Sequence, residues 1–150
     1  QMRGPDLQLL PKSLDGFRAV QRVMAAGGNL GMLIDQKLNE GIAVPFFGRS
    51  AMTTPAPAQM AARYRAVVVV GHAERLGPAR YRLRAEIVDL PQAADRSAAS
   101  RKAADLAAMT VLNAKIEQQI RANPGDWFWL HRRWPESKGP WPDPTLPAGR

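Results

Sequence analysis

Residues 66–71 read AVVVVG and form the longest apolar run of this chain. A short, unbroken run of β-branched residues is typical of a strand that is buried on both faces of a sheet. Residues 30–34, LGMLI, form a second such run upstream and predict a second buried strand. Neither run approaches the roughly 20 apolar residues that a membrane-spanning helix needs.

A helix is predicted between these two strands. Thr53 or Thr54 can cap its N-terminus, because a hydroxyl oxygen accepts hydrogen bonds from the free N–H groups of a first turn. That turn accommodates Pro55 and Pro57, and the helix ends near Tyr64. Strand, helix and strand in this order imply a right-handed parallel crossover. The sequence therefore predicts an α/β fold in which helices pack on a mixed, largely parallel sheet.

Two further helices flank this unit. One begins after Ser13, has apolar residues at helical spacing and ends at the glycine pair 27–28. The other covers about residues 98–121 and ends at NPG, residues 123–125. The tryptophan-rich residues 127–134 can form one more short helix after it.

Residues 80–87 predict a half-exposed strand near the edge of the sheet, antiparallel to its predecessor. Arg80, Arg82 and Arg84 alternate there with apolar residues, and Arg75 lies in the preceding turn. Such an alternating face is most often simply solvated. The alternative is that these guanidinium groups dock an acidic partner or lipid phosphates, which arginine binds bidentately.

The chain is predicted to form one folded domain, residues 1–134, followed by a flexible tail, residues 135–150. Its 150 residues suffice for one hydrophobic core, and no repeat or composition shift marks a second domain. The tail is rich in proline, which does not fit regular elements. Residues 41–48 also contain Pro45, which argues against a central strand there.

The formal net charge of +8 favours polyanionic partners, which are nucleic acid, anionic lipid or an acidic carrier protein. Nucleic acid is the weakest of these, because the aromatic residues cluster near the C-terminus and do not interleave with the basic strand. The chain has no cysteine, which excludes disulfides and thiolate metal sites. With only two histidines, a multi-histidine metal site is not expected.

Two segments carry candidate substrate residues. Asp35 and Gln36 follow a predicted buried strand, and ligands of open α/β sheets bind outside the carboxyl ends of strands. The alternative is that this pair simply opens a turn. Phe46 and Phe47 precede Gly48. Their rings are either ordinary core or the wall of an apolar slot, where the glycine lets a ligand approach the backbone.

Residues 127–134 read WFWLHRRW and combine large amphipathic rings with fixed positive charge. This combination suits the boundary between an apolar phase and anionic head groups. His131 and Glu136 have the spacing of a catalytic histidine and acid, but Pro135 lies between them and Glu136 opens the tail. No fixed pair is therefore expected. His72 follows a predicted strand and is more simply a structural residue.

In this order the segments resemble the lipid A biosynthesis lauroyl/myristoyl acyltransferases, the Kdo-dependent late acyltransferases, in the C-terminal half of that family. The resemblance rests on DQ at 35–36, GIAVPFFGRSAMT at 41–53, NAKIEQQIRANP at 113–124 and WFWLHRRW at 127–134. It extends over nearly the whole chain, from about residue 4 to residue 134.

The resemblance implies an enzyme that transfers a fatty acyl chain from acyl carrier protein to a hydroxyl group of a Kdo-bearing lipid A precursor, without a cofactor. It implies a fold similar to that of glycerol-3-phosphate acyltransferases and a place at the cytoplasmic face of the bacterial inner membrane. The family's catalytic histidine, followed after four residues by an aspartate, has no counterpart in this sequence. Together with Gln1 at the position of an initiating methionine, this predicts the C-terminal portion of an acyltransferase, inactive by itself.

The resemblance also implies roles for the candidate residues. The floor of the substrate pocket is assigned to Asp35 and Gln36. The lining of the acyl channel is assigned to Phe46, Phe47 and Gly48. Contact with phosphate and head groups at the membrane interface is assigned to Arg132 and Arg133, together with Trp127, Trp129 and Trp134.

Two alternatives stay open. The acyltransferases of mannosylated phosphatidylinositol share much of this sequence pattern. A non-catalytic basic module that binds anionic membrane or lipopolysaccharide would also show the positive charge and the tryptophan–arginine segment.

Overall fold

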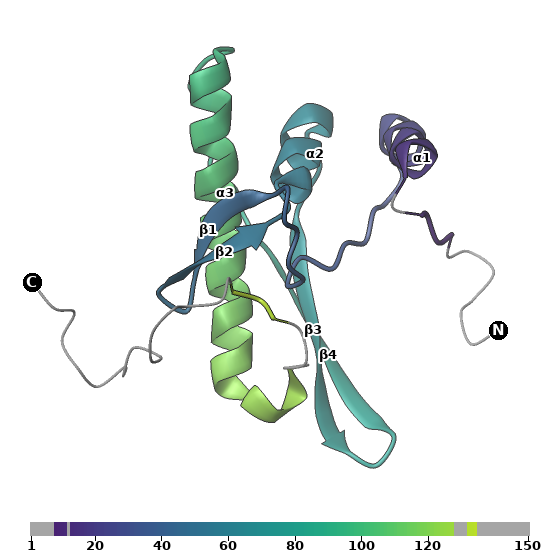
Figure 1. Cartoon of the computed structure of the whole chain (residues 1–150). Coiled ribbons are helices and arrows are strands. Elements are labelled where there is room, and N and C mark those ends of the chain that lie inside the picture. The colour runs from purple at the N-terminus through teal and green to yellow at the C-terminus, as the bar shows by residue number, and fades with distance from the viewer. Residues whose placement is uncertain (1–7, 12, 128–131, 135–150) are drawn as a thin grey trace, which may run out of the picture.

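The computed structural model describes residues 8–11, 13–127 and 132–134 (Figure 1). Its elements in chain order are α1 (Leu14–Ala25), β1 (Ile42–Phe46), β2 (Arg49–Thr53), α2 (Ala56–Tyr64), β3 (Val69–Gly77), β4 (Arg80–Ile87), α3 (Ala98–Ala122) and the 3-10 helix η1 (Pro124–Asp126).

The long helix α3 is the element on which the other elements pack. The hairpin of β1 and β2 lies across it, α2 packs beside it, and the hairpin of β3 and β4 projects away from it (Figure 1). α1 lies on the far side of α2 at the end of an irregular segment, residues 28–40. No helix in the described parts of the chain is both long enough and apolar enough to cross a bilayer.

The three longer predicted helices are confirmed, and a hydroxyl group accepts a backbone hydrogen bond near the N-terminus of each, although the N-cap residue of α2 is Pro55 and not a threonine. Ser13 Oγ accepts a hydrogen bond from the Gly16 N–H at 3.2 Å at the start of α1. Thr54 Oγ1 accepts from the Ala56 N–H at 3.3 Å before α2, and Ser97 accepts at the start of α3. Half of the helix predicted at 127–134 and the whole tail at 135–150 lie outside the described residues, and the described residues 127 and 132–134 are not helical.

The sheet differs from the prediction. Within the described residues the strands form two separate antiparallel pairs, β1 with β2 and β3 with β4, and no parallel pair occurs there. Residues 30–34 form no strand, and Leu33 is 78% exposed. The predicted parallel crossover is therefore wrong for this part of the chain, whereas a mixed α/β structure is confirmed. An apolar run indicates that a segment favours burial. It does not show that a neighbouring strand is present for the segment to pair with.

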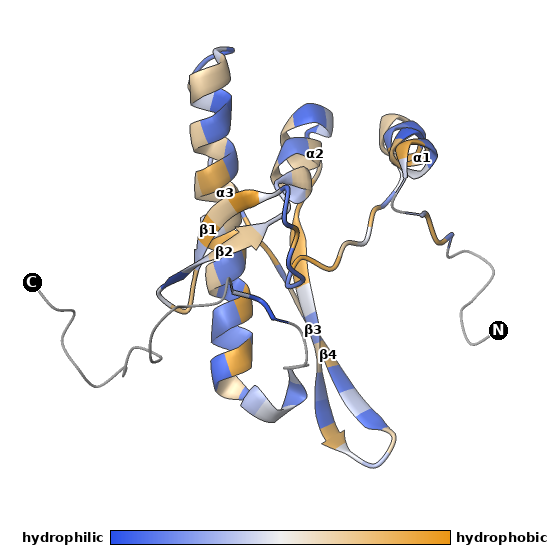
Figure 2. Cartoon of the chain, in the orientation of Figure 1, coloured by the Kyte–Doolittle hydropathy of each residue, from blue (hydrophilic) through white to orange (hydrophobic). Residues whose placement is uncertain are grey.

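The valine run also differs in part from the prediction. β3 begins only at Val69, and Val67 and Val69 are 72% and 56% exposed. The alternate residues Val68 and Val70 pack against the core. This strand therefore buries one face and leaves the other open. β4 pairs antiparallel with β3 as predicted, and Figure 2 shows polar and apolar residues alternating along both strands. Contrary to the prediction, β4 is exposed along its whole length and not half-exposed, and Arg75 lies in β3 and not in a turn.

A two-residue turn joins β1 to β2. Phe46 faces Arg49 across the hairpin, and Phe47 and Gly48 between them have φ values of 50° and 71°. Two consecutive positive φ values are the geometry of a type I′ turn, whose twist matches that of antiparallel strands. Pro45 is tolerated in β1 because each strand of a two-stranded sheet is an edge strand.

Two apolar clusters hold the β1–β2 hairpin to α3. In the first, Val44 of β1 packs with Met109 and Leu112 of α3, and all three are almost completely buried. In the second, Phe46 of β1 packs with Ile120 near the end of α3. Burying one such side chain contributes roughly 1.5–3 kcal/mol, so these contacts dominate the docking of the hairpin.

Candidate functional site, an aromatic and arginine cluster beside an apolar groove

The three segments that the sequence singled out meet at one end of the β1–β2 hairpin. Trp127 donates a hydrogen bond from its indole Nε1 to Asp35 Oδ2 at 3.0 Å. Trp134 donates from its Nε1 to the Phe46 carbonyl oxygen, also at 3.0 Å. Residues about 90 positions apart in the sequence are therefore joined by both tryptophans. The structure brings Asp35, Phe46 and the described tryptophans together.

The aromatic rings form a packed cluster around Phe46, which is completely buried. Its ring centroid lies 4.9 Å from that of Phe47 and 5.8 Å from that of Trp127, both in edge-to-face contact. Trp134 stacks on it at 5.5 Å. Such pairs contribute about 0.5–1.5 kcal/mol each beyond the burial of area. Trp127 and Trp134, which the sequence assigned to the membrane interface, are half-buried in this cluster.

Arg133 is also internal. Its Nη1 donates to the Met52 carbonyl oxygen at 2.7 Å, and its Nη2 donates to Thr53 Oγ1 at 2.6 Å. Its guanidinium carbon lies 5.1 Å from the centroid of the Phe46 ring. The side chain is fully buried, so it holds strand β2 to the C-terminal segment and does not point to a surface where head groups bind.

The electrostatics of Arg133 follow from this position. Burial lowers the pKa of Arg133 from its usual value, and the nearby charge of Asp35 acts in the opposite direction. An arginine stays charged in proteins under ordinary conditions, so burying Arg133 costs free energy of desolvation that other interactions must offset. Its two short hydrogen bonds and its contact with Phe46 compensate part of that cost.

The turn at Phe47 and Gly48 is anchored by α3. The Phe47 N–H donates to Glu117 Oε1 at 2.7 Å, and the other oxygen of Glu117 pairs with Arg121 at 2.9 Å. The guanidinium of Arg121 lies 4.6 Å from the centroid of the Phe47 ring. One turn earlier, Asn113 Nδ2 donates to the Pro45 carbonyl oxygen at 3.0 Å. These contacts hold a non-glycine residue in the left-handed region, which alone costs about 1–2 kcal/mol.

The roles of Asn113 and Glu117 were missed by sequence reasoning. The two residues lie four apart on a predicted helix, on one face with apolar neighbours, and this is the signal that could have found them. Their partners in the hairpin are about 70 residues away, so the sequence gives no sign of the contact.

Replacing Glu117 by alanine is expected to lower the free energy of unfolding by about 1.5–3 kcal/mol, the contribution of a hydrogen bond to a charged group. Glu117→Gln keeps an acceptor for the Phe47 N–H and is expected to lose less. The matched control is Glu86→Ala, which breaks an exposed pair with Lys115 worth about 0–1 kcal/mol. Urea denaturation of the three variants measures this, and equal losses for Glu117→Ala and Glu86→Ala would contradict the anchoring role.

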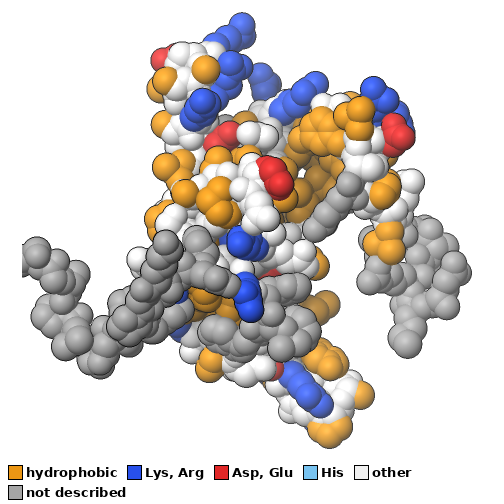
Figure 3. Space-filling model, viewed as in Figure 1, with side chains coloured by type: hydrophobic (Ala, Val, Ile, Leu, Met, Phe, Trp, Pro, Cys, Tyr) orange, Lys and Arg blue, Asp and Glu red, His pale blue; other side chains and the backbone are white. Residues whose placement is uncertain are grey.

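A large groove lies beside this cluster. Its volume is about 1060 Å³, and α1, residues 28–35, α2, β3 and α3 contribute to its walls. Figure 3 shows it as a hollow lined by apolar side chains between α1 and α2. Its polar lining includes Asp35, His72 and Asp126. This volume slightly exceeds the range of about 300–1,000 Å³ that is typical of small-molecule sites.

Some of the predicted substrate residues line the groove, and others pack behind the residues that line it. Asp35 and Trp127 line the groove. Phe46 and Phe47 do not line it, but they pack with Trp134 around Trp127. A carboxylate held beside an apolar groove can accept a hydrogen bond from a substrate hydroxyl group. The arrangement is suited to a ligand with a long apolar chain and a hydroxyl-bearing end.

The remaining candidate residues do not line the groove or lie outside the described residues. Gln36 is half-buried next to Asp35, and Arg132 is exposed. Trp129 and His131 lie outside the described residues. Within the part of the chain that the structure describes, no group of acidic and histidine side chains is arranged to hold a metal ion.

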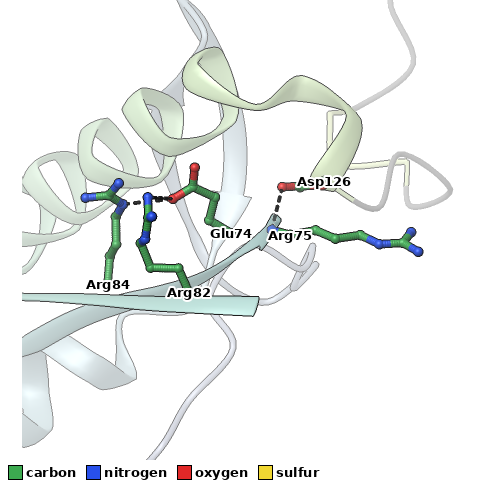
Figure 4. A network of polar contacts seen from close by, with 5 residues as sticks. All are labelled: Glu74, Arg75, Arg82, Arg84 and Asp126. Carbon is green, nitrogen blue, oxygen red and sulfur yellow. Dashed lines mark hydrogen bonds and ion pairs between the residues drawn. The ribbon is translucent and has the colours of Figure 1, made fainter. Parts of the chain in front are cut away.

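The basic strand face is neutralised in part by one carboxylate. Glu74 of β3 pairs with Arg84 at 3.1 Å and with Arg82 at 3.5 Å (Figure 4). The hydrogen bond from Arg84 is the main reason that the pKa of Glu74 lies below its usual value. These are exposed pairs, so most of this face is solvated, as the simpler interpretation of the sequence predicted.

One family model matches a region of the chain that includes both the aromatic cluster and the residues that line the groove. The model of one family, described as bacterial lipid A biosynthesis acyltransferase, matches residues 3–136. A comparison with individual curated proteins gives no match. The matched region includes Asp35, the Phe46 turn, α3 and the tryptophan–arginine segment. This chain therefore belongs to the bacterial lipid A biosynthesis acyltransferase family.

Proposed function

We propose that this chain is the C-terminal, substrate-binding portion of a lipid A acyltransferase. The reaction moves a fatty acyl chain from acyl carrier protein to a hydroxyl group of a Kdo-bearing lipid A precursor, at the cytoplasmic face of the bacterial inner membrane. The observation that supports it is the meeting of Asp35, the Phe46 turn and Trp127 at an apolar groove, within a chain of this family.

In this proposal the groove holds a fatty acyl chain. Its apolar walls remove the chain from water, at roughly 0.8 kcal/mol per buried methylene group. Asp35 lines the groove and orients a hydroxyl group, with Gln36 beside it. Phe46 and Phe47 support the groove indirectly, because they pack in one cluster with Trp127 and Trp134, and Gly48 completes the turn that positions them. Exposed Arg132 binds phosphate.

The general base is proposed to come from outside these 150 residues. The sequence contains no histidine followed after four residues by aspartate, and the isolated chain is therefore expected to show no turnover. The complete fold is proposed to resemble that of glycerol-3-phosphate acyltransferases, with the residues described here as one part of it.

An acyl-transfer assay tests this function. The complete protein encoded by the reading frame that contains these residues is incubated with acylated acyl carrier protein and a Kdo-bearing lipid A precursor. Transfer is expected, and Asp35→Asn is expected to lower kcat/KM about 10- to 100-fold, as the loss of a hydrogen bond to a charged group does. Asp105→Asn is the control, because Asp105 accepts a hydrogen bond from Gln59 of α2 and does not line the groove.

Two outcomes would redirect the proposal. Transfer to mannosylated phosphatidylinositol in place of the lipid A precursor would favour that related branch of acyltransferases. Transfer to no lipid acceptor would contradict the enzyme function. It would favour instead a non-catalytic module that binds anionic membrane or lipopolysaccharide, for which the net charge of +8 is the supporting observation.

A further inference from the structure

The hairpin of β3 and β4 has two different faces. Side chains alternate between the faces of a strand, and cross-strand partners share a face. One face carries Glu74, Arg82 and Arg84 in the ion pairs described above. By the strand register, the other face carries four cross-strand pairs, which are Val69 with Ile87, Gly71 with Ala85, Ala73 with Leu83, and Arg75 with Tyr81. We call this second face the open face of the hairpin.

The open face exposes large apolar side chains. The exposed fractions are 56% for Val69, 61% for Tyr81, 82% for Leu83 and 72% for Ile87. Figure 3 shows apolar side chains gathered on the projecting hairpin. Single exposed apolar residues are ordinary, but a contiguous patch marks a binding surface. A two-stranded sheet is also marginally stable in water without a second layer, so this face needs a covering.

The charge on the open face indicates what covers it. Arg75 is its only charged residue, and it carries no carboxylate. Figure 4 shows the Arg75 side chain extending away from Glu74, Arg82 and Arg84, and among the described residues its guanidinium has no partner. A second copy of this face would bring another arginine and no acid. A surface that is apolar and also negatively charged therefore complements the open face.

An anionic bilayer meets both requirements. Its acyl chains accept Leu83 and Ile87, and its phosphates pair with Arg75, whose aliphatic stem can lie along the apolar surface. Tyr81 lies directly opposite Arg75, and tyrosine is enriched at the boundary between apolar chains and head groups. The arrangement therefore matches the layering of a membrane interface.

The open face is also continuous with the groove. Val69, Gly71 and Ala73 of β3 lie on the open face and line the groove as well. We propose that the open face of the β3–β4 hairpin docks on an anionic lipid bilayer, so that the groove opens toward the membrane surface. The proposal deepens the proposed function and rests on it, because an enzyme that acylates a membrane lipid must take its acceptor from the bilayer.

Vesicle flotation of the whole chain tests this docking. Phosphatidylcholine vesicles are compared with vesicles that also contain phosphatidylglycerol, and binding is expected to the second kind. Leu83→Ser with Ile87→Ser is expected to weaken binding at least about tenfold, because two exposed apolar side chains lose their burial in lipid. Arg75→Gln is expected to weaken it about fivefold, as the loss of one basic residue near an anionic surface does.

Matched controls separate docking from general charge and folding. Leu106→Ser removes a leucine of α3 that is 42% exposed, and Arg101→Gln removes the same charge as Arg75→Gln. Both variants are expected to bind normally, because neither residue lies on the hairpin. Thermal melting should show that all variants stay folded, because the substituted side chains are exposed.

Three results would overturn the proposal. They are equal binding to neutral and anionic vesicles, equal binding of the wild-type chain and the Leu83→Ser, Ile87→Ser variant, and a dimer in sedimentation experiments that this variant abolishes. The last would show that a second copy covers the open face. Acyl transfer to a detergent-dispersed acceptor without hairpin-dependent vesicle binding would contradict this proposal alone. Vesicle binding through the hairpin without transfer would contradict the proposed function alone.

Discussion

Replacing Arg133 by methionine is expected to lower the free energy of unfolding by about 2–4 kcal/mol. The two hydrogen bonds to Met52 O and Thr53 Oγ1 come from a charged donor and contribute about 1.5–3 kcal/mol each. Removing the buried charge offsets part of this loss of stability, because the desolvation cost of the guanidinium disappears. The hydrogen bonds outweigh that gain, since methionine fills the space but leaves both acceptors with one partner fewer.

The neighbouring arginine provides the control for this experiment. Arg132 is exposed, and Arg132→Met is expected to change the free energy of unfolding by no more than about 0.5 kcal/mol. Arg133→Lys keeps the charge but not the planar fork, so it retains one hydrogen bond and falls between the two. Urea denaturation followed by circular dichroism gives all three values. Equal midpoints for Arg133→Met and Arg132→Met would contradict the internal position of Arg133.

Replacing Phe46 by alanine is expected to cost about 3–5 kcal/mol, the range for removing a buried aromatic ring. Phe46 is completely buried, and its ring contacts Phe47, Trp127 and Trp134. The cavity left behind removes the support of both tryptophans. Their fluorescence in the folded state is therefore expected to shift to longer wavelength, because water gains access to the indole rings.

Phe17 of α1 is the matched control for Phe46. It is 46% exposed, and Phe17→Ala is expected to cost less than about 1 kcal/mol and to leave tryptophan fluorescence unchanged. A loss of similar size for both variants, or an unchanged emission spectrum for Phe46→Ala, would show that the aromatic cluster is not organised around Phe46.

Much of the local structure could be predicted from the sequence. α1 begins after Ser13, as the capping residue and the apolar spacing indicated, and α3 covers Ala98–Ala122, as the apolar spacing and the NPG stop at 123–125 indicated. The alternation along residues 80–87 correctly predicted an antiparallel edge strand. These features depend on interactions within one or two turns of a helix or between adjacent strands, so their signals lie close together in the sequence.

The sequence predicted which residues belong to the candidate site but not how they are arranged. The sequence singled out Asp35, Phe46 and residues 127–134, and the structure joins them through Trp127 and Trp134. It gave no sign that Arg133 is buried, because a charged residue beside tryptophans is expected at a surface. The acceptors that permit its burial, Met52 and Thr53, lie about 80 residues upstream.

By itself, the sequence determined the helices, the antiparallel strand and the family, because each is encoded in short-range patterns and ordered motifs. Only the tertiary structure decided which strands pair, which face of the β3–β4 hairpin stays open and which arginine is internal. The physical reason is that pairing and burial depend on partners distant in the sequence. An apolar run favours a buried position and a positive charge favours an exposed one. The actual position depends on the partners that folding brings beside each residue.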